Sequence, residues 1–203
     1  MLHRIISLVV AVLLAVFALP WCWLQLRHQW LLHIANARDP FPDDPMSVAI
    51  GLLVGCALVW WKRPNWFIHT TIHELCHLLM CMLLLVPVHS FRASHRQGGE
   101  VVHDAAPDAL RSTLISIAPY VVPLLLVPCL LAAHLLPEGR WHALASGLAG
   151  FAAVHHVQGL FHNVRLNFWG KDSDLVKIGR PLSLVLIVGA LALVAAWTIS
   201  VLW

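Results

Sequence analysis

Long apolar stretches dominate this sequence and limit its possible folds more than any other feature. They occupy residues 5–24, 46–61, 66–88, 113–136, 142–161 and 182–203. Most of them approach the length of about 20 residues that a helix needs to cross the hydrocarbon core of a bilayer. Of all residues, 60% are hydrophobic and only 11% are charged, whereas charged residues make up about 25% of a typical soluble domain. The bilayer is therefore the expected solvent of this chain.

We expect an all-α membrane protein, a polytopic bundle of about six transmembrane helices. Tryptophans lie mostly near the ends of the apolar stretches, where amphipathic rings settle at a membrane interface. A proline-rich linker at 38–45 separates the first two stretches, because prolines at that density interrupt a helix. The polar segment 89–111 contains Gly98 and Gly99, which allow a short re-entrant hairpin between the third and fourth helices.

Charge and cysteine usage exclude two classes of protein. The net charge of +3 is not gathered in a basic tract, so nucleic acid is not an expected partner. The five cysteines include no C-x-x-C pair, which argues against a thiolate zinc site and against a disulfide framework.

The third stretch contains His73-Glu74-Leu75-Cys76-His77, which has the pattern H-E-x-x-H. Residues four apart on a helix lie on one face, so His73 and His77 are able to bind one Zn²⁺ together. Glu74 is then placed to take a proton from a metal-bound water, whose pKa the metal lowers toward neutrality. Glu74 is also the only acidic residue well inside an apolar stretch, where an unpaired charge costs about 2.5–3.5 kcal/mol. The pattern therefore predicts a hydrolytic zinc site within the bilayer.

A catalytic zinc ion usually takes a third protein ligand and keeps one position open. Two sets of residues are candidates: Asp172 and Asp174 before the last stretch, and His155, His156 and His162 in the fifth. Depth in the bilayer favours the histidines. In a simple up-and-down bundle, Asp174 falls on the far side from the start of the third helix. The residues alone leave this choice open.

The sequence resembles the M50 metalloproteases, the site-2 protease class, and within it the M50B-like group. The resemblance extends from about residue 66 to residue 203. It rests on the H-E-x-x-H helix, the Gly-containing segment 97–101, the span with Pro119 and the segment 171–175. In that family an aspartate late in the chain completes the zinc site, and Asp174 is the best positional match. Two departures, Cys76 in place of a small residue and the absence of a Leu-Asp-Gly sequence, leave room for an inactive relative.

The resemblance implies a catalytic Glu74 and a Zn²⁺ ion held by His73, His77 and Asp174. It also implies a membrane protein substrate that is cut within a transmembrane helix, and a strand edge at 98–102 is one way to hold such a substrate extended. We expect one integral membrane domain over residues 1–203, with two N-terminal helices and a linker in 1–65 and a metalloprotease-like core in 66–203. The expected location is multi-pass, in the plasma (inner) membrane of a bacterium.

Three other classes compete with the zinc protease: a catalytically inactive M50-like protein with a binding or regulatory role, a histidine-rich membrane di-iron oxygenase, and a metal transporter. The 14 histidines suit an oxygenase, but that class needs several clustered H-x-x-H-H boxes and the chain has a single adjacent pair. Among the other polar residues, His69 is interpreted as a helix-end residue, with support of a metal ligand or the lining of a pore as the alternative. Tyr120, the only tyrosine, is interpreted as an interface anchor in preference to a catalytic donor. Asn163 and Asn167 are candidate donors to an oxyanion.

Overall fold

The computed structural model describes residues 2–36, 43–61, 65–94, 98–170 and 173–202. In chain order the elements are α1 (Leu2–Leu13), the π-helical turn η1 (Leu14–Ala18), α2 (Leu19–Asn36), α3 (Asp43–Trp61), α4 (Trp66–Leu83), β1 (Val88–Ser94), β2 (Gly98–His103), α5 (Ala109–Val121), α6 (Leu126–Leu135), α7 (Arg140–Asn167), α8 (Asp174–Ile178) and α9 (Arg180–Leu202). The expected helical architecture is confirmed, with one small antiparallel sheet added to it.

Two helical segments are long and apolar enough to cross a membrane, Leu8–His28 and α9. The helices α5 and α6 count as a third span if they form one interrupted crossing. Within the described residues, the apolar parts of α3 and α4 are shorter, and α7 carries polar residues that lower its mean hydropathy. The structure therefore shows a helical membrane protein with two or three candidate spans, and the expected number of six is not confirmed.

Contacts divide the chain into two compact units, each assembled from segments that are far apart in the sequence. Unit 1 comprises Met1–Ala11, Pro64–Val122 and Gly159–Leu186, and unit 2 comprises Val12–Arg63, Pro123–Gln158 and Ile187–Trp203. The expectation of a single membrane domain over residues 1–203 stays a prediction. The motif helix α4 belongs to unit 1, which is described first.

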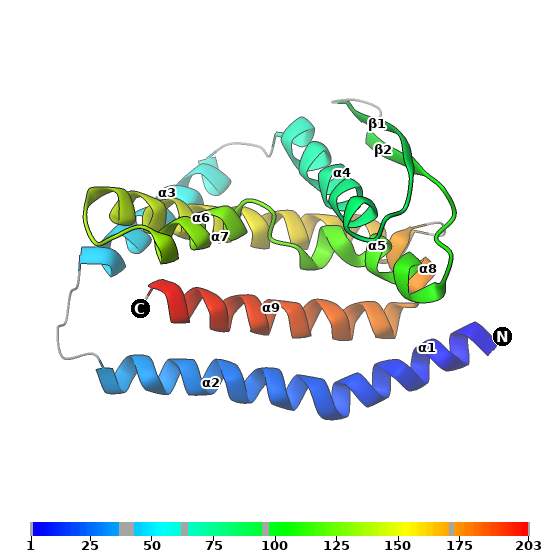
Figure 1. The fold of residues 1–203 in the computed structure, drawn as a ribbon, viewed down its shortest axis with the longest axis horizontal. Helices are drawn as coiled ribbons and strands as arrows, with labels where there is room; N and C mark the ends of the chain where they lie inside the picture. The colour runs from blue at the N-terminus through cyan, green and yellow to red at the C-terminus, as the bar shows by residue number, and fades with distance from the viewer. Residues whose placement is uncertain (1, 37–42, 62–64, 95–97, 171–172, 203) are drawn as a thin grey trace. The chain divides into compact units, whose positions relative to one another are not determined.

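Helix α4 begins at a side-chain cap and ends at a change of backbone direction. The side chain of Asn65 accepts hydrogen bonds from the backbone N–H groups of Phe67 and Ile68, at 3.1 and 3.4 Å, which satisfies two donors that a helix start leaves open. After the helix, Leu85 adopts a positive φ of 56°, and the chain turns into β1. In unit 1, α4 contacts both strands and α5 (Figure 1). Buried Cys81, Val86 and Ile115 form the core beneath these elements.

The hairpin expected between the third and fourth apolar stretches is present. Strand β1 pairs with β2 in antiparallel register, with Phe91 opposite Val101 and Ala93 opposite Gly99. At the open end of the hairpin, the backbone N–H of Asp104 donates to the carbonyl of Pro87 at 3.0 Å. The hairpin lies against α4 (Figure 1), so it covers the helix that carries the H-E-x-x-H pattern.

In unit 2, glycines bring α3 and α7 into close contact. A Cβ atom on Gly51 would lie 1.9 Å from the backbone oxygen of Gly147, and one on Gly150 would lie 2.5 Å from that of Val48. Backbones approach this closely only where side chains are absent, as small residues allow between membrane helices. The neighbouring core contains further small residues and a few larger ones: Val48, Leu126, Leu130, Ala133, Ala145, Ala149, Ala152 and Leu202.

Replacement of Gly51 by alanine is expected to destabilise unit 2. The new methyl group overlaps a backbone oxygen that cannot rotate away, and overpacking of this kind costs about 1–3 kcal/mol. Thermal unfolding in detergent micelles measures the change. Gly189→Ala is the matched control, because its Cβ would lie in ordinary contact, 3.7 Å from Leu19. Equal unfolding temperatures for the two variants would contradict the close packing.

Candidate metal centre

Helix α4 presents His73 and His77 on one face, one turn apart. Their Nε2 atoms lie 3.3 Å from each other, and their ring centroids are separated by 5.0 Å. This spacing follows from the helix itself, because residues four apart are neighbours along its surface.

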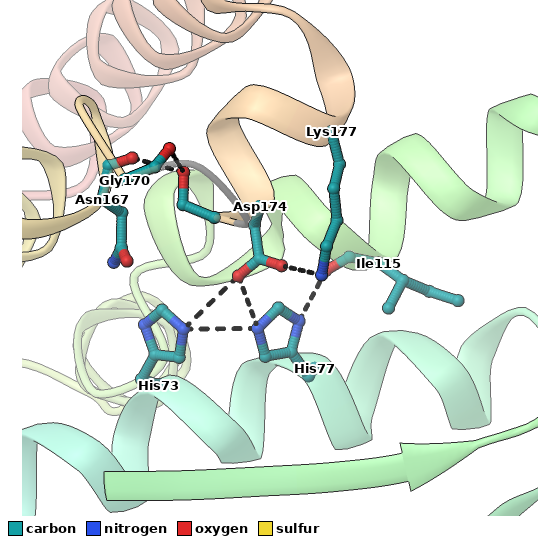
Figure 2. Close-up of polar contacts among 8 residues, drawn as sticks. His73, His77, Ile115, Asn167, Gly170, Asp174 and Lys177 are labelled. Carbon is teal, nitrogen blue, oxygen red and sulfur yellow. Dashed lines mark hydrogen bonds and ion pairs between the residues drawn. The ribbon is translucent and has the colours of Figure 1, made fainter.

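Asp174 joins the two histidines from a different part of the chain. Its Oδ2 atom lies 3.5 Å from Nε2 of His77 and 3.9 Å from Nε2 of His73, as Figure 2 shows. Asp174 is the first residue of α8, a helix of five residues that contacts α5. Leu175 and Ile178, which are 1% and 4% exposed, anchor α8 in unit 1.

The position of Asp174 corrects the argument from depth in the bilayer. An up-and-down bundle places this residue away from the start of the motif helix, yet the carboxylate lies beside both imidazoles. The reason is that the segment before α9 folds back as a separate short helix. Ser173, directly before α8, is held in place by its hydroxyl, which donates to the backbone oxygens of Asn167 and Gly170.

The other candidate ligands are not part of this cluster. The ring of His162 lies 6.1 Å from that of His69, and His69, in the first turn of α4, is buried at 8% exposure. His155 and His156 belong to unit 2, and Asp172 lies outside the described residues. Within the described ranges, one group of three His, Cys, Asp or Glu residues has metal-binding geometry: His73, His77 and Asp174.

The distances within this group suit a tetrahedral metal ion. Zinc binds imidazole nitrogen and carboxylate oxygen at about 2.0–2.2 Å, so two ligand atoms of a tetrahedron lie about 3.3–3.6 Å apart. The observed separations between the three ligand atoms are 3.3, 3.5 and 3.9 Å. Two of them match the tetrahedral value, and the third exceeds it by a few tenths of an ångström. The residues therefore fit a zinc ion with one position left open.

The hydrogen bond of His77 determines which of its ring nitrogens carries a proton and which faces His73 and Asp174. Its Nδ1 lies 2.8 Å from the backbone carbonyl of Ile115 (Figure 2). A carbonyl only accepts hydrogen bonds, so Nδ1 carries the proton. In the neutral imidazole, Nε2 then presents a lone pair toward His73 and toward the carboxylate of Asp174. These atoms repel one another unless a proton or a metal ion lies between them.

Asp174 is held as a carboxylate in this arrangement. Burial acts to raise the pKa of its carboxyl, but hydrogen bonding and charge attraction from His77 and Lys177 outweigh burial, and the pKa lies below its ordinary value. The Nζ atom of Lys177 lies 3.2 Å from Oδ1 of Asp174 (Figure 2). The two oxygens of the Asp174 carboxylate therefore have different neighbours: Oδ1 faces Lys177, and Oδ2 faces the two histidines.

Glu74 lies next to the cluster and under the hairpin. Its side chain is buried at 8% exposure, and a Cβ atom on Gly99 would lie 2.3 Å from its Cγ. Both residues line a cavity of about 570 Å³ that the three cluster residues also line. The remaining lining residues come from β2, the β2–α5 connection, α5 and α8: Glu100, Val101, His103, Ala105, Ala106, Ser112, Ile115, Ser116 and Lys177. The cluster and Glu74 therefore open onto the same cavity.

Sequence reasoning missed two residues of this site. Tyr120 is not an interface anchor: it is 0% exposed, and its ring packs edge-on against His73 with centroids 5.8 Å apart. No sequence signal distinguishes it, because the contact joins two helices. Lys177 was detectable, since it follows Asp174 by three residues and such residues are neighbours on a helix.

Comparison with known proteins identifies one family. Residues 46–164 match a family model described as Peptidase M50B-like. The matched region contains the H-E-x-x-H pattern and the hairpin, and it ends before Asp174, so the place of Asp174 in the site rests on geometry. No curated protein and no solved structure matches the chain.

Gly99→Ala is expected to lift β2 from α4. The added methyl group overlaps the Glu74 side chain at 2.3 Å and that of Thr70 at 2.7 Å, and overpacking costs about 1–3 kcal/mol. We expect faster amide hydrogen exchange across Gly98–His103, measured by mass spectrometry. Gly170→Ala is the control, because its Cβ meets Ser173 at an ordinary 3.4 Å. Unchanged exchange in Gly99→Ala would show that the hairpin does not rest on Glu74.

Proposed function

Since the chain belongs to the Peptidase M50B-like family, we propose that this membrane protein is an intramembrane zinc metalloprotease of the site-2 protease class. In this proposal His73, His77 and Asp174 hold Zn²⁺, and Glu74 is the general base. The observation that carries it is the convergence of three ligand atoms, two imidazole nitrogens and one carboxylate oxygen, at separations of 3.3, 3.5 and 3.9 Å.

The role of each of these groups follows from its chemistry. Bound zinc supplies a Lewis acid that makes water nucleophilic near neutral pH. Glu74 follows His73 directly on α4 and lines the same cavity, so its carboxylate is placed to remove a proton from the attacking water. It is then placed to deliver that proton to the amine that leaves when the peptide bond breaks.

The apolar helices of this chain support a membrane-embedded substrate. A transmembrane helix shields its peptide bonds within intrahelical hydrogen bonds, so a segment of it has to be unwound before it is cut. The cavity is bordered by β2 residues Gly99, Glu100 and Val101, and a strand edge holds an extended segment by backbone hydrogen bonds. In this proposal the protein is multi-pass and lies in the plasma (inner) membrane of a bacterium.

The departure at Cys76 is compatible with the proposed metal site. Cys76 is 2% exposed, and its Sγ lies 3.9 Å from the backbone oxygen of Val122, so the thiol packs into unit 1. The absence of a Leu-Asp-Gly sequence is likewise compatible with binding, because Asp174 still reaches both histidines. These contacts favour the active enzyme over an inactive relative.

Metal analysis tests the ligand set. The purified protein is expected to hold one zinc per chain, and His73→Ala and Asp174→Ala are each expected to lose it, because two ligands alone bind zinc far more weakly than three. Elemental analysis after size-exclusion chromatography gives the stoichiometry. His162→Ala is the matched control and is expected to retain zinc. Two irons per chain would instead identify an oxygenase.

Glu74→Gln tests catalysis separately from metal binding. The amide keeps the size of the side chain but cannot take up a proton, so we expect full zinc occupancy and a loss of at least about 100-fold in cleavage, as for other general bases. Cleavage of a reporter transmembrane helix, reconstituted with the protein in vesicles, is followed by gel electrophoresis. Cleavage at the wild-type rate would remove Glu74 from the mechanism.

A further inference from the structure

Two buried polar atoms at the metal centre have no hydrogen-bond partner among the described residues: Nδ1 of His73 and the hydroxyl of Tyr120. They belong to side chains that touch, since the two rings meet edge-on with centroids 5.8 Å apart and planes at 84°. Buried polar groups in proteins are nearly always hydrogen-bonded, so an unpartnered one calls for a specific explanation. Because the two atoms belong to residues in contact, we expect a single explanation for both.

The two histidines of the centre differ in how their second ring nitrogen is held. Nδ1 of His77 donates to the carbonyl of Ile115 at 2.8 Å. Nδ1 of His73 makes no such bond within the described chain. A histidine that binds a metal almost always donates its other N–H to a carboxylate, a carbonyl or a water, which fixes the tautomer and the ring orientation. His73 therefore lacks one partner that its proposed role requires.

Tyr120 and Asn167 supply the polar groups around this position. Tyr120 is 0% exposed, so its hydroxyl has no access to bulk solvent. The Asn167 side chain is a hydrogen-bonding neighbour of that hydroxyl, at a separation too long for a direct bond. In Figure 2 the His73 nitrogen that faces away from Asp174 is on the side of the view where the Asn167 amide lies. A buried water needs two to four polar partners, and Nδ1 of His73, the Tyr120 hydroxyl and the Asn167 amide would supply three.

We propose that Tyr120 is a positioning residue for His73: its hydroxyl, together with the Asn167 amide, holds one buried water that accepts the Nδ1–H of His73. This inference rests on the proposed zinc site. The water fixes the proton on Nδ1, so the lone pair of Nε2 faces the metal. It also gives the Tyr120 hydroxyl a partner, which removes the cost of leaving a buried hydroxyl without a hydrogen bond.

Tyr120→Phe tests the hydroxyl alone, because phenylalanine keeps the ring that packs against His73. Loss of an outer partner of a metal-binding histidine typically weakens metal binding 10–100-fold. We therefore expect zinc affinity to fall by about 10–100-fold, measured by competition with a chromogenic chelator in detergent micelles. The visible absorption spectrum of bound Co²⁺ is expected to change as well, because it reports the geometry of the ligands.

Two further variants complete the test: a control that removes a hydroxyl outside unit 1, and a second substitution at the proposed water. Thr198→Val removes a hydroxyl that bonds the backbone of α9 in unit 2, and it is expected to leave zinc affinity unchanged. Asn167→Leu removes a second partner of the same water and is expected to weaken zinc binding even if Tyr120→Phe fails to fold. Zinc affinity and Co²⁺ spectra equal to wild type in either Tyr120→Phe or Asn167→Leu would overturn the inference.

The same measurements distinguish this inference from the proposed function. Wild-type protein that binds zinc, with Tyr120→Phe binding it equally well, removes the role of Tyr120 and leaves the zinc site intact. Wild-type protein that binds no zinc overturns the proposed function and this inference together.

Discussion

The convergence of three electron-rich atoms on one point is the constraint on which the rest of unit 1 depends. Two imidazole nitrogens and a carboxylate oxygen lie 3.3–3.9 Å apart, and the carbonyl of Ile115 orients one imidazole so that its lone pair faces the others. Such an arrangement is unfavourable without a cation and favourable with one. The cap of α4, the anchoring of α8 and the contact between α4 and α5 all hold this geometry in place.

The hairpin and the carboxylate beneath it form a second layer around this point. Glu74 is buried in an apolar helix, where an unpaired charge is costly, and the absence of a side chain at Gly99 lets β2 lie directly over it. The cavity beside the strand is bordered by both. The proposed base, the metal-binding group and a strand edge therefore line one cavity in an otherwise apolar chain, which is the arrangement that the proposed hydrolysis in a membrane would require.

Sequence reasoning succeeded where the determining interactions are local. The H-E-x-x-H spacing places His73 and His77 on one face because helix periodicity is a property of neighbouring residues, and Gly98 with Gly99 indicated the hairpin, whose second strand they begin. It was less successful for the number of spans, because α7 is long but carries polar residues, and α5 and α6 are separate helices. Depth in a bundle misplaced Asp174, because the folding back of α8 depends on its buried residues Leu175 and Ile178.

The sequence by itself determined that this chain is helical and suited to a membrane, and that one helix carries two imidazoles and a carboxylate in a metal-binding pattern. Only the tertiary structure decided that Asp174 completes the cluster, that Gly99 covers Glu74 and that Tyr120 packs on His73. The physical reason is the separation along the chain of the residues that interact. Periodicity and hydropathy are set by residues close together in the chain, whereas each of these contacts joins elements whose meeting depends on how the whole of unit 1 packs.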